Sequence, residues 1–156
     1  MLKIKAVTKE LRSFYGRSQW TLRVWRTTPY HSCFSPELCS PDVFHCYSSF
    51  EQLIHHDHCG ALKKGRFFLC EVRGRSAIRY DKEGWTEMRL VKEIKLPSKK
   101  SLIRFLPKGP VKKAFHQKKF VSYRSIVIEL RHLGQLERVL KKFFKEVKSA
   151  QNQSSF

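Results

Sequence analysis

The sequence predicts an α+β fold, and three patterns support this class. Residues 66–72 are apolar and rich in aromatic and branched side chains, and apolar and polar residues alternate from 86 to 96; both patterns are typical of β-strands. A helix-capping pattern lies at the start of residues 49–56, and the apolar residues of 135–149 form one stripe at helical spacing. Both patterns are typical of α-helices. We therefore expect a mostly antiparallel sheet with a short helix near 49–56 and an amphipathic C-terminal helix near 135–149.

Two further segments are predicted as strands. Residues 20–25 alternate between apolar and polar, which indicates a strand that turns Trp20, Leu22 and Val24 toward the core. Residues 120–130 are rich in β-branched side chains, which also favours a strand.

The two helices are predicted from local signals. Ser48 and Ser49 are followed three residues later by Glu51 and Gln52, the capping-box pattern of a helix N-terminus. The apolar stripe of the C-terminal segment consists of Leu136, Val139, Leu140, Phe143, Phe144 and Val147. The opposite face is rich in lysine, so this helix could lie on a membrane surface, but packing on a sheet explains the same stripe and is the preferred interpretation.

Length and composition predict a single folded domain. A chain of 156 residues with 41% hydrophobic and 13% aromatic residues can bury a core without disulfides or a metal. We expect one α+β domain over residues 1–149 and a disordered polar tail over 150–156. The five cysteines are an odd number, and neither a secretory signal nor a membrane span is visible. These features predict a cytoplasmic protein with reduced thiols and no membrane partner.

Charge is the strongest functional signal in the sequence. The chain carries 32 Lys and Arg against 13 Asp and Glu, a net charge of +19, and ten of these cations lie between Glu93 and Glu129, where no acid occurs. Such an excess predicts binding to nucleic acid, DNA or RNA, through phosphate contacts. The predicted phosphate-binding residues are Lys99, Lys100, Arg104, Lys108, Lys112, Lys113, Lys118, Lys119 and Arg124. No helix-turn-helix, zinc-finger or RNA-recognition signature is present, so we expect no strong sequence specificity.

Four aromatic residues are interleaved with these cations: Phe105, Phe115, Phe120 and Tyr123. Aromatic faces can stack on unpaired bases, but large apolar residues are mostly buried, and we expect these four in the core. The alternative partner is a protein or a ribonucleoprotein complex. In that case the chain would be a basic protein-binding module that inhibits an acidic host protein.

Several fragments of the first half of the chain occur in a recognisable order. They are Glu10–Ser13, Tyr15-Gly16, Gln19-Trp20, Leu38–Pro41, Phe44–Cys46, Cys70–Gly74, Asp81-Lys82 and Trp85–Val91. Together they resemble a family of small uncharacterised bacteriophage and prophage proteins over residues 8–95. The resemblance implies a phage or mobile-element origin and a bacterial cytoplasm, and it carries no established activity, cofactor or catalytic residue. Residues 96–149 lie outside it and form a basic extension.

Eight cysteines and histidines fall within one stretch: Cys33, Cys39, His45, Cys46, His55, His56, His58 and Cys59. Zinc takes four thiolate or imidazole ligands. The candidate ligands are Cys39, His45, His58 and Cys59. No Cys-x2-Cys or His-x3-His pair occurs, and free cysteines are commonly small buried residues. We therefore expect no cofactor, with zinc as the alternative.

Two enzyme interpretations stand beside nucleic-acid binding. Asp42, Glu71 and Arg73 resemble the carboxylate-plus-base set of metal-dependent nucleases, but an arginine cannot act as a base near neutral pH. The set His45, Tyr47, Ser48, Ser49, Glu83 and Glu87 resembles the site order of a small ADP-ribosyltransferase. The serines are also explained as helix caps and the glutamates as surface residues. For an enzyme, the predicted catalytic residues are His45, Glu71 and Glu87, which would have to meet in one cleft.

Overall fold

The computed structural model describes residues 2–14, 18–29, 38, 42–56 and 60–143. Within them it contains helices and one open antiparallel sheet, so the predicted α+β class is confirmed. The chain divides into two compact units, residues 1–95 and residues 96–156, which are described separately. The second unit begins at the residue where the basic extension is expected to begin. That residues 1–149 fold as a single domain stays a prediction.

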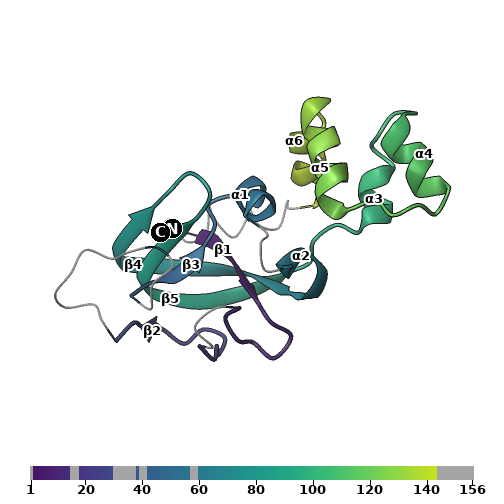
Figure 1. Ribbon diagram of the computed structural model, residues 1–156. Helices are drawn as coiled ribbons and strands as arrows, with labels where there is room; N and C mark the ends of the chain where they lie inside the picture. The colour runs from purple at the N-terminus through teal and green to yellow at the C-terminus, as the bar shows by residue number, and fades with distance from the viewer. Residues whose placement is uncertain (1, 15–17, 30–37, 39–41, 57–59, 144–156) are drawn as a thin grey trace. The chain divides into compact units, whose positions relative to one another are not determined.

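The sheet of the first unit is built around a long hairpin. Its strands are β1 (Leu2–Val7), β2 (Arg26–Thr27), β3 (Phe44–Cys46), β4 (Arg66–Ile78) and β5 (Glu83–Ile94). The order is β1-β4-β5-β2, all pairs are antiparallel, and β3 pairs with a different stretch of β5. Figure 1 shows β4 and β5 as long curved strands with β1 beside them. The strands expected at 66–72 and 86–96 correspond to β4 and β5, of which β5 ends at Ile94.

The hairpin bends where its register shifts between Arg73 and Ser76. Gly74 has a φ of +83°, a left-handed conformation that favours glycine. A Cβ atom at Gly74 would collide with the hydroxyl of Thr86, which accepts a hydrogen bond from the Arg75 N–H at 3.0 Å. The bulge therefore depends on glycine, and it redirects the end of the strand.

One hydrophobic cluster forms the core of the first unit. Its buried members are Val7, Trp20, Phe44, Cys46, Phe68, Cys70, Val72, Met88 and Leu90. The Trp20 ring meets Phe44 edge-on with centroids 4.9 Å apart, and its indole N–H donates to Ser13 at 2.8 Å. Because a buried indole N–H needs a partner, this bond fixes the orientation of the Trp20 ring.

Two short helices, α1 (Phe50–His55) and α2 (Ala61–Lys64), complete the described part of the first unit. The Gln52 N–H donates to the Ser49 hydroxyl at 3.2 Å, and the Ser48 N–H donates to the Gln52 side chain at 2.7 Å. The first bond is the predicted serine N-cap. In the second, the Gln52 side chain reaches back to the residue before the cap, whereas a regular capping box uses the N–H of the cap residue itself. The short helix expected near 49–56 is thereby confirmed.

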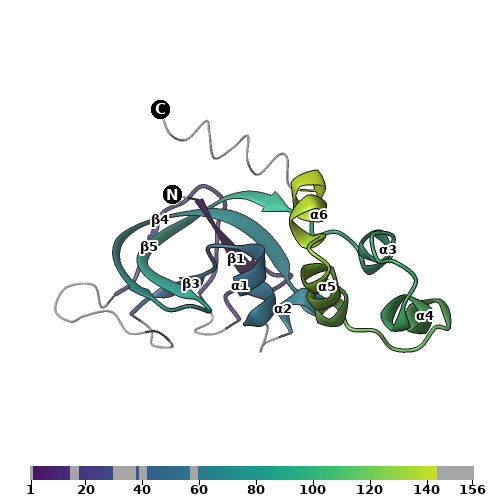
Figure 2. The ribbon, with the colours of Figure 1, turned by 90° about the horizontal axis from the view of Figure 1, so that it is seen from above.

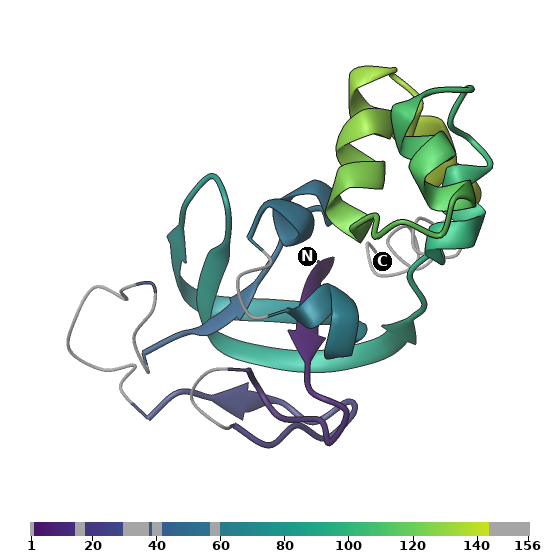
Figure 3. The same ribbon diagram turned by 45° about the vertical axis from the view of Figure 1, so that its right-hand side comes forward.

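The described part of the second unit is a group of helices. They are α3 (Lys99–Ile103), α4 (Pro110–His116), α5 (Tyr123–His132) and α6 (Leu136–Phe143). The helix α5 contacts each of the other three. Figure 2 shows α5 with α6 on one side of the unit and α3 with α4 on the other, and in Figure 3 the four helices form one group. Both α3 and α5 begin with a serine, Ser98 or Ser122, whose hydroxyl accepts the N–H of a second serine three residues later.

The strand predicted at 120–130 is wrong, because most of this segment belongs to α5. Ser122 caps the helix N-terminus, and Ile126, Val127 and Leu130 are buried at helical spacing. Branched residues favour strands only weakly, and the packing of this face decides the conformation.

The strand predicted at 20–25 is also wrong. Trp20 is buried as expected, but Leu22 and Val24 are 41% and 50% exposed. Arg23 has a φ of +63°, which interrupts the extended chain and with it the alternation of faces.

The amphipathic helix expected near 135–149 is present as α6 as far as residue 143. Leu136 and Val139 of its apolar stripe are buried. Residues 144–149 and the predicted tail 150–156 lie outside the described residues. In the part of the chain that is described, no helix has the length and apolar character needed to cross a membrane.

Candidate nucleic-acid interface

Seven of the nine predicted phosphate-binding cations are exposed on the second unit. They are Lys100, Arg104, Lys108, Lys113, Lys118, Lys119 and Arg124. Within the described part of the chain, none of these seven side chains forms an ion pair or a hydrogen bond. Their charge is therefore available to an external anion.

The other two predicted cations have structural roles. The Nζ of Lys99 donates to the Val121 carbonyl at 2.8 Å, and the Nζ of Lys112 donates to the Leu106 carbonyl at 2.8 Å. Both lysines are half-buried. Each one satisfies a backbone acceptor in a connection between helices, so we assign these two to the fold rather than to the interface.

The first unit pairs several of its surface arginines with acids. Three of them face a glutamate across the hairpin, Arg66–Glu93 at 2.6 Å, Arg73–Glu87 at 2.6 Å and Arg89–Glu71 at 2.5 Å. Residues 1–95 hold 17 Lys and Arg against 10 acids, a net charge of +7, whereas residues 96–156 hold 15 against 3, a net charge of +12. The uncompensated charge is thus concentrated in the smaller unit.

Two of the exposed cations are adjacent, in the connection between α4 and α5. The Lys118 N–H donates to the Phe115 carbonyl at 3.1 Å, and the Lys119 N–H donates to the Ala114 carbonyl at 3.0 Å. With the left-handed φ of +56° at Lys118, these bonds form a Schellman C-cap. Glycine is usual at the left-handed position, because a Cβ atom is strained there. A lysine keeps a cationic side chain at this turn despite that strain.

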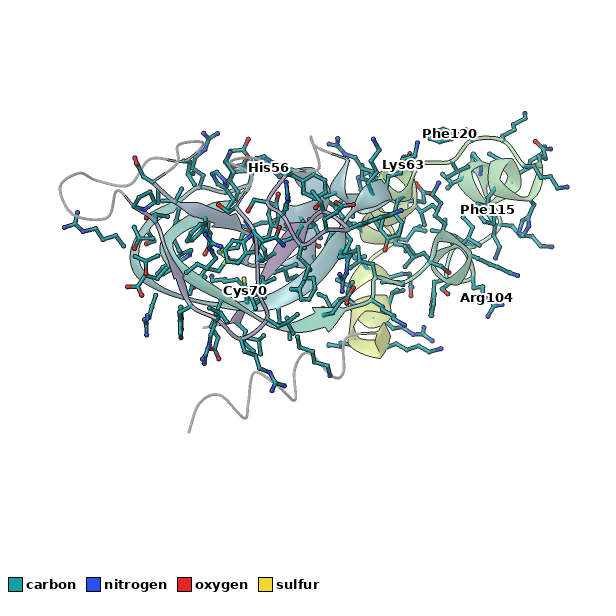
Figure 4. The ribbon with its side chains drawn as sticks, turned by 90° about the horizontal axis from the view of Figure 1, so that it is seen from below. His56, Lys63, Cys70, Arg104, Phe115 and Phe120 are labelled. Atoms are coloured by element: carbon teal, nitrogen blue, oxygen red, sulfur yellow. The ribbon has the colours of Figure 1, made fainter. Side chains whose placement is uncertain are left out.

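The four interleaved aromatic residues fall into two groups. Phe105 and Phe115 are half-buried, and Tyr123 donates its hydroxyl to the Pro97 carbonyl at 2.9 Å. Burial raises the pKa of Tyr123. Phe120, by contrast, is 89% exposed, and Figure 4 shows it on the connection between α4 and α5. The expectation that all four lie in the core is wrong for Phe120.

The glutamates predicted as catalytic lie in an ion-pair array on the hairpin. Glu71 faces Arg89, and Glu87 faces Arg73, each across the two strands. The guanidinium groups of Arg73 and Arg89 lie 4.0 Å and 5.0 Å from the centroid of the Trp25 ring. Both carboxylates are therefore paired with arginines. Arg73, the arginine of the nuclease-like set, is itself paired with Glu87. This arrangement suits a surface ladder rather than a magnesium site.

His45 lies on β3, in a different environment from those two glutamates. Burial, followed by the charges of Lys5, Lys82 and His56, lowers the pKa of His45 to about 3. The backbone carbonyl of His45 accepts a hydrogen bond from the Lys5 ammonium at 2.7 Å. The imidazole is therefore neutral at neutral pH.

Part of the ADP-ribosyltransferase-like set does come together. The Lys3 Nζ donates to one carboxylate oxygen of Glu83 at 2.9 Å and to the Ser48 hydroxyl at 2.8 Å. The Ser48 hydroxyl donates to the same Glu83 oxygen. The Trp85 indole N–H donates to the other Glu83 oxygen at 3.0 Å. Burial acts to raise the pKa of Glu83, but the hydrogen bonds from Ser48, Trp85 and Lys3 outweigh it and lower the pKa. Both carboxylate oxygens are thus occupied, and Glu83 neutralises a buried lysine.

Three of the four candidate zinc ligands, Cys39, His58 and Cys59, lie outside the described residues. Among the residues that are described, no group of three His, Cys, Asp or Glu side chains is arranged to hold a metal ion. Cys46 and Cys70 are free, buried thiols of the core, and burial raises the pKa of Cys70. These two cysteines act as small apolar residues.

Comparison with known proteins gives no relative. No family model, no curated protein and no solved structure was found to match this chain. The resemblance to small phage proteins therefore stays a prediction.

Phe120 is the exposed aromatic residue that the sequence interpretation placed in the core. The signal that could have identified it is its position between the cation pair Lys118-Lys119 and the helix cap Ser122. Such a position lies in a connection between helices, and connections run over the surface of a protein.

Proposed function

We propose that this protein binds nucleic acid through phosphate contacts made by its second unit, without strong sequence specificity. The observation that carries the proposal is the set of seven exposed cations that no acid compensates within the described residues. A cation that contacts a phosphate releases condensed counterions, and this release drives binding at low salt. Phosphate contacts position a protein on nucleic acid but carry no sequence information.

The placement of one of these cations supports a role outside folding. Arg124 occupies the first turn of α5, and this first turn contains no acid. The positive end of the helix dipole favours acids at this position. A cation there adds nothing to helix stability, and contact with an anion explains its presence.

The spread of the cations favours nucleic acid over an acidic protein. They come from α3, α4, the connections and α5, and nucleic acid offers phosphates at a regular short spacing that such a dispersed set can meet. An origin in a phage or other mobile element and a cytoplasmic location belong to the same proposal. They rest on the resemblance of residues 8–95.

The test is a binding measurement across a salt series. Labelled single-stranded and double-stranded DNA and RNA of about 20 nucleotides are titrated by fluorescence anisotropy between about 50 and 300 mM salt. We expect a slope of log affinity against log salt of about −5 or steeper, since each phosphate contact contributes about 0.7–0.9. Weak binding to all four probes at about 50 mM salt would overturn the proposal.

A triple variant, Lys100→Glu, Lys108→Glu and Arg124→Glu, locates the interface. These residues are exposed and precede or begin helices, where glutamate is compatible with the helix dipole, so the fold should be kept. The magnitude of the slope of log affinity against log salt should fall by about 2–3, and the affinity should fall for every probe alike.

The matched control is a second triple variant in the first unit, Lys9→Glu, Lys63→Glu and Lys64→Glu, which changes three exposed lysines and shifts the net charge equally. It should bind almost as the wild type does. Equal losses in the two variants would mean that overall charge, and not this surface, determines binding.

A further inference from the structure

Phe120 is the most exposed large apolar side chain among the described residues, at 89%. The hydrophobic effect favours burial of a phenylalanine, so its exposure calls for a physical explanation. Larger apolar patches mark protein-binding sites. Phe120 is instead a single ring that follows three exposed polar or cationic residues, 117–119.

The backbone on both sides of Phe120 is held in place. Before it, the Lys119 N–H donates to the Ala114 carbonyl at 3.0 Å and closes the C-cap of α4. After it, Val121 is buried and Ser122 caps α5. The ring therefore extends from a fixed point, and binding a ligand there needs little ordering of the chain.

The surroundings of the ring are cationic. The Lys99 ammonium lies 5.3 Å from the ring centroid, close enough for a cation–π contact, and it is itself held by the Val121 carbonyl at 2.8 Å. No aromatic ring of the described residues stacks on Phe120. Much of its surface is thus open to a flat ligand, with Lys118 and Lys119 next to it in the chain.

We infer that Phe120 is a stacking platform for an unpaired base of single-stranded nucleic acid, with Lys118 and Lys119 on the flanking phosphates. An aromatic ring surrounded by cations matches a nucleotide chain, in which apolar bases alternate with anionic phosphates. In a duplex the base faces are covered by neighbouring base pairs, so this contact favours single strands. The inference rests on the proposed function and deepens it by naming the substrate class.

The test compares Phe120→Ala, Phe120→Leu and Phe120→Trp with the wild type on four probes. The probes are oligo(dT), oligo(U), an abasic DNA strand of the same length and a DNA duplex. The exposed site tolerates all three changes without loss of the core, and circular dichroism checks the fold. Phe120→Leu keeps an apolar side chain but removes the aromatic face.

We expect Phe120→Ala and Phe120→Leu to bind oligo(dT) and oligo(U) roughly 5- to 100-fold more weakly than the wild type, and Phe120→Trp to bind at least as tightly. Binding to the abasic strand and to the duplex should stay within about twofold for all three variants. A larger loss on oligo(U) than on oligo(dT) would identify RNA as the preferred strand, and the reverse would identify DNA.

Unchanged binding of oligo(dT) and oligo(U) by Phe120→Ala would overturn the inference, while salt-dependent binding by the wild type would leave the proposed function standing. Wild-type affinity in Phe120→Leu, or an equal loss on the abasic strand, would overturn it as well, because neither outcome requires a base on the ring. Absence of binding by the wild type to every probe would remove the proposed function and the inference together.

Discussion

Replacement of Lys118 by glycine should stabilise the protein and weaken its binding at the same time. Lys118 holds a left-handed φ of +56° at the C-cap of α4. That conformation costs a residue with a Cβ atom about 1–2 kcal/mol. Glycine avoids this strain but loses about 0.5–1 kcal/mol through its greater freedom in the unfolded chain. The net gain in unfolding free energy is about 0.5–1 kcal/mol, in the middle of the difference of about 0–1.5 kcal/mol between these two ranges.

Urea unfolding followed by circular dichroism measures the gain. With a slope of about 2 kcal/mol per M, the midpoint should rise by about 0.25–0.5 M. The same variant lacks one phosphate contact, so the salt slope of binding should lose about 0.7–0.9. These opposite signs separate the contribution of Lys118 to folding from its contribution to binding.

The matched control is Lys119→Gly, which removes the same charge at a residue outside the left-handed conformation. It should weaken binding similarly and should not raise the midpoint, because glycine relieves no strain there. A destabilised Lys118→Gly would refute the C-cap argument. A stabilised Lys118→Gly with unchanged binding would remove Lys118 from the interface.

Three other predictions concern stability. Glu83→Gln should lower the unfolding free energy by about 3–5 kcal/mol, because Lys3 would stay buried without its counter-charge. Glu93→Gln, in a more exposed ion pair, should lower it by less than about 1 kcal/mol. Equal losses of the two variants in urea unfolding would contradict the argument. The pKa of His45 is lowered to about 3, so the unfolded chain is protonated there first, and stability should fall as pH drops from about 6.5 toward 3. A His45→Asn variant should show a weaker dependence of stability on pH. If the dependence stays as steep as in the wild type, groups other than His45 cause it. Ser122→Ala should cost about 1 kcal/mol through loss of the α5 cap, and an unchanged unfolding midpoint would show that the cap contributes nothing.

Elements with short-range signals could be predicted from the sequence. The cap of α1 is encoded within residues 48–52, and in the structure the Ser49 hydroxyl accepts the Gln52 N–H as this pattern predicts. The strands β4 and β5 are predicted by long apolar or alternating runs of residues, and such a pattern stays recognisable when one residue departs from it. Seven of the nine predicted phosphate-binding residues are exposed because charged side chains rarely become buried without a partner.

Features that depend on distant contacts could not be predicted. Lys3 is buried because Glu83, 80 residues away in the chain, neutralises it. The helix α5 has a strand-like composition, and its conformation depends on packing against the other helices of its unit. The left-handed backbone at Arg23 breaks an otherwise regular alternation without a glycine to mark it.

Net charge alone does not locate an anion-binding surface, because screening limits the reach of a charge to about 8 Å at physiological ionic strength. On the β4–β5 hairpin each of three arginines has a carboxylate within 2.6 Å, so an approaching phosphate meets nearly cancelling charges. On the second unit the seven exposed cations have no such partner in the described residues, and their attraction is undiminished at contact. Two variants with the same net charge should therefore differ in binding according to which unit loses its cations.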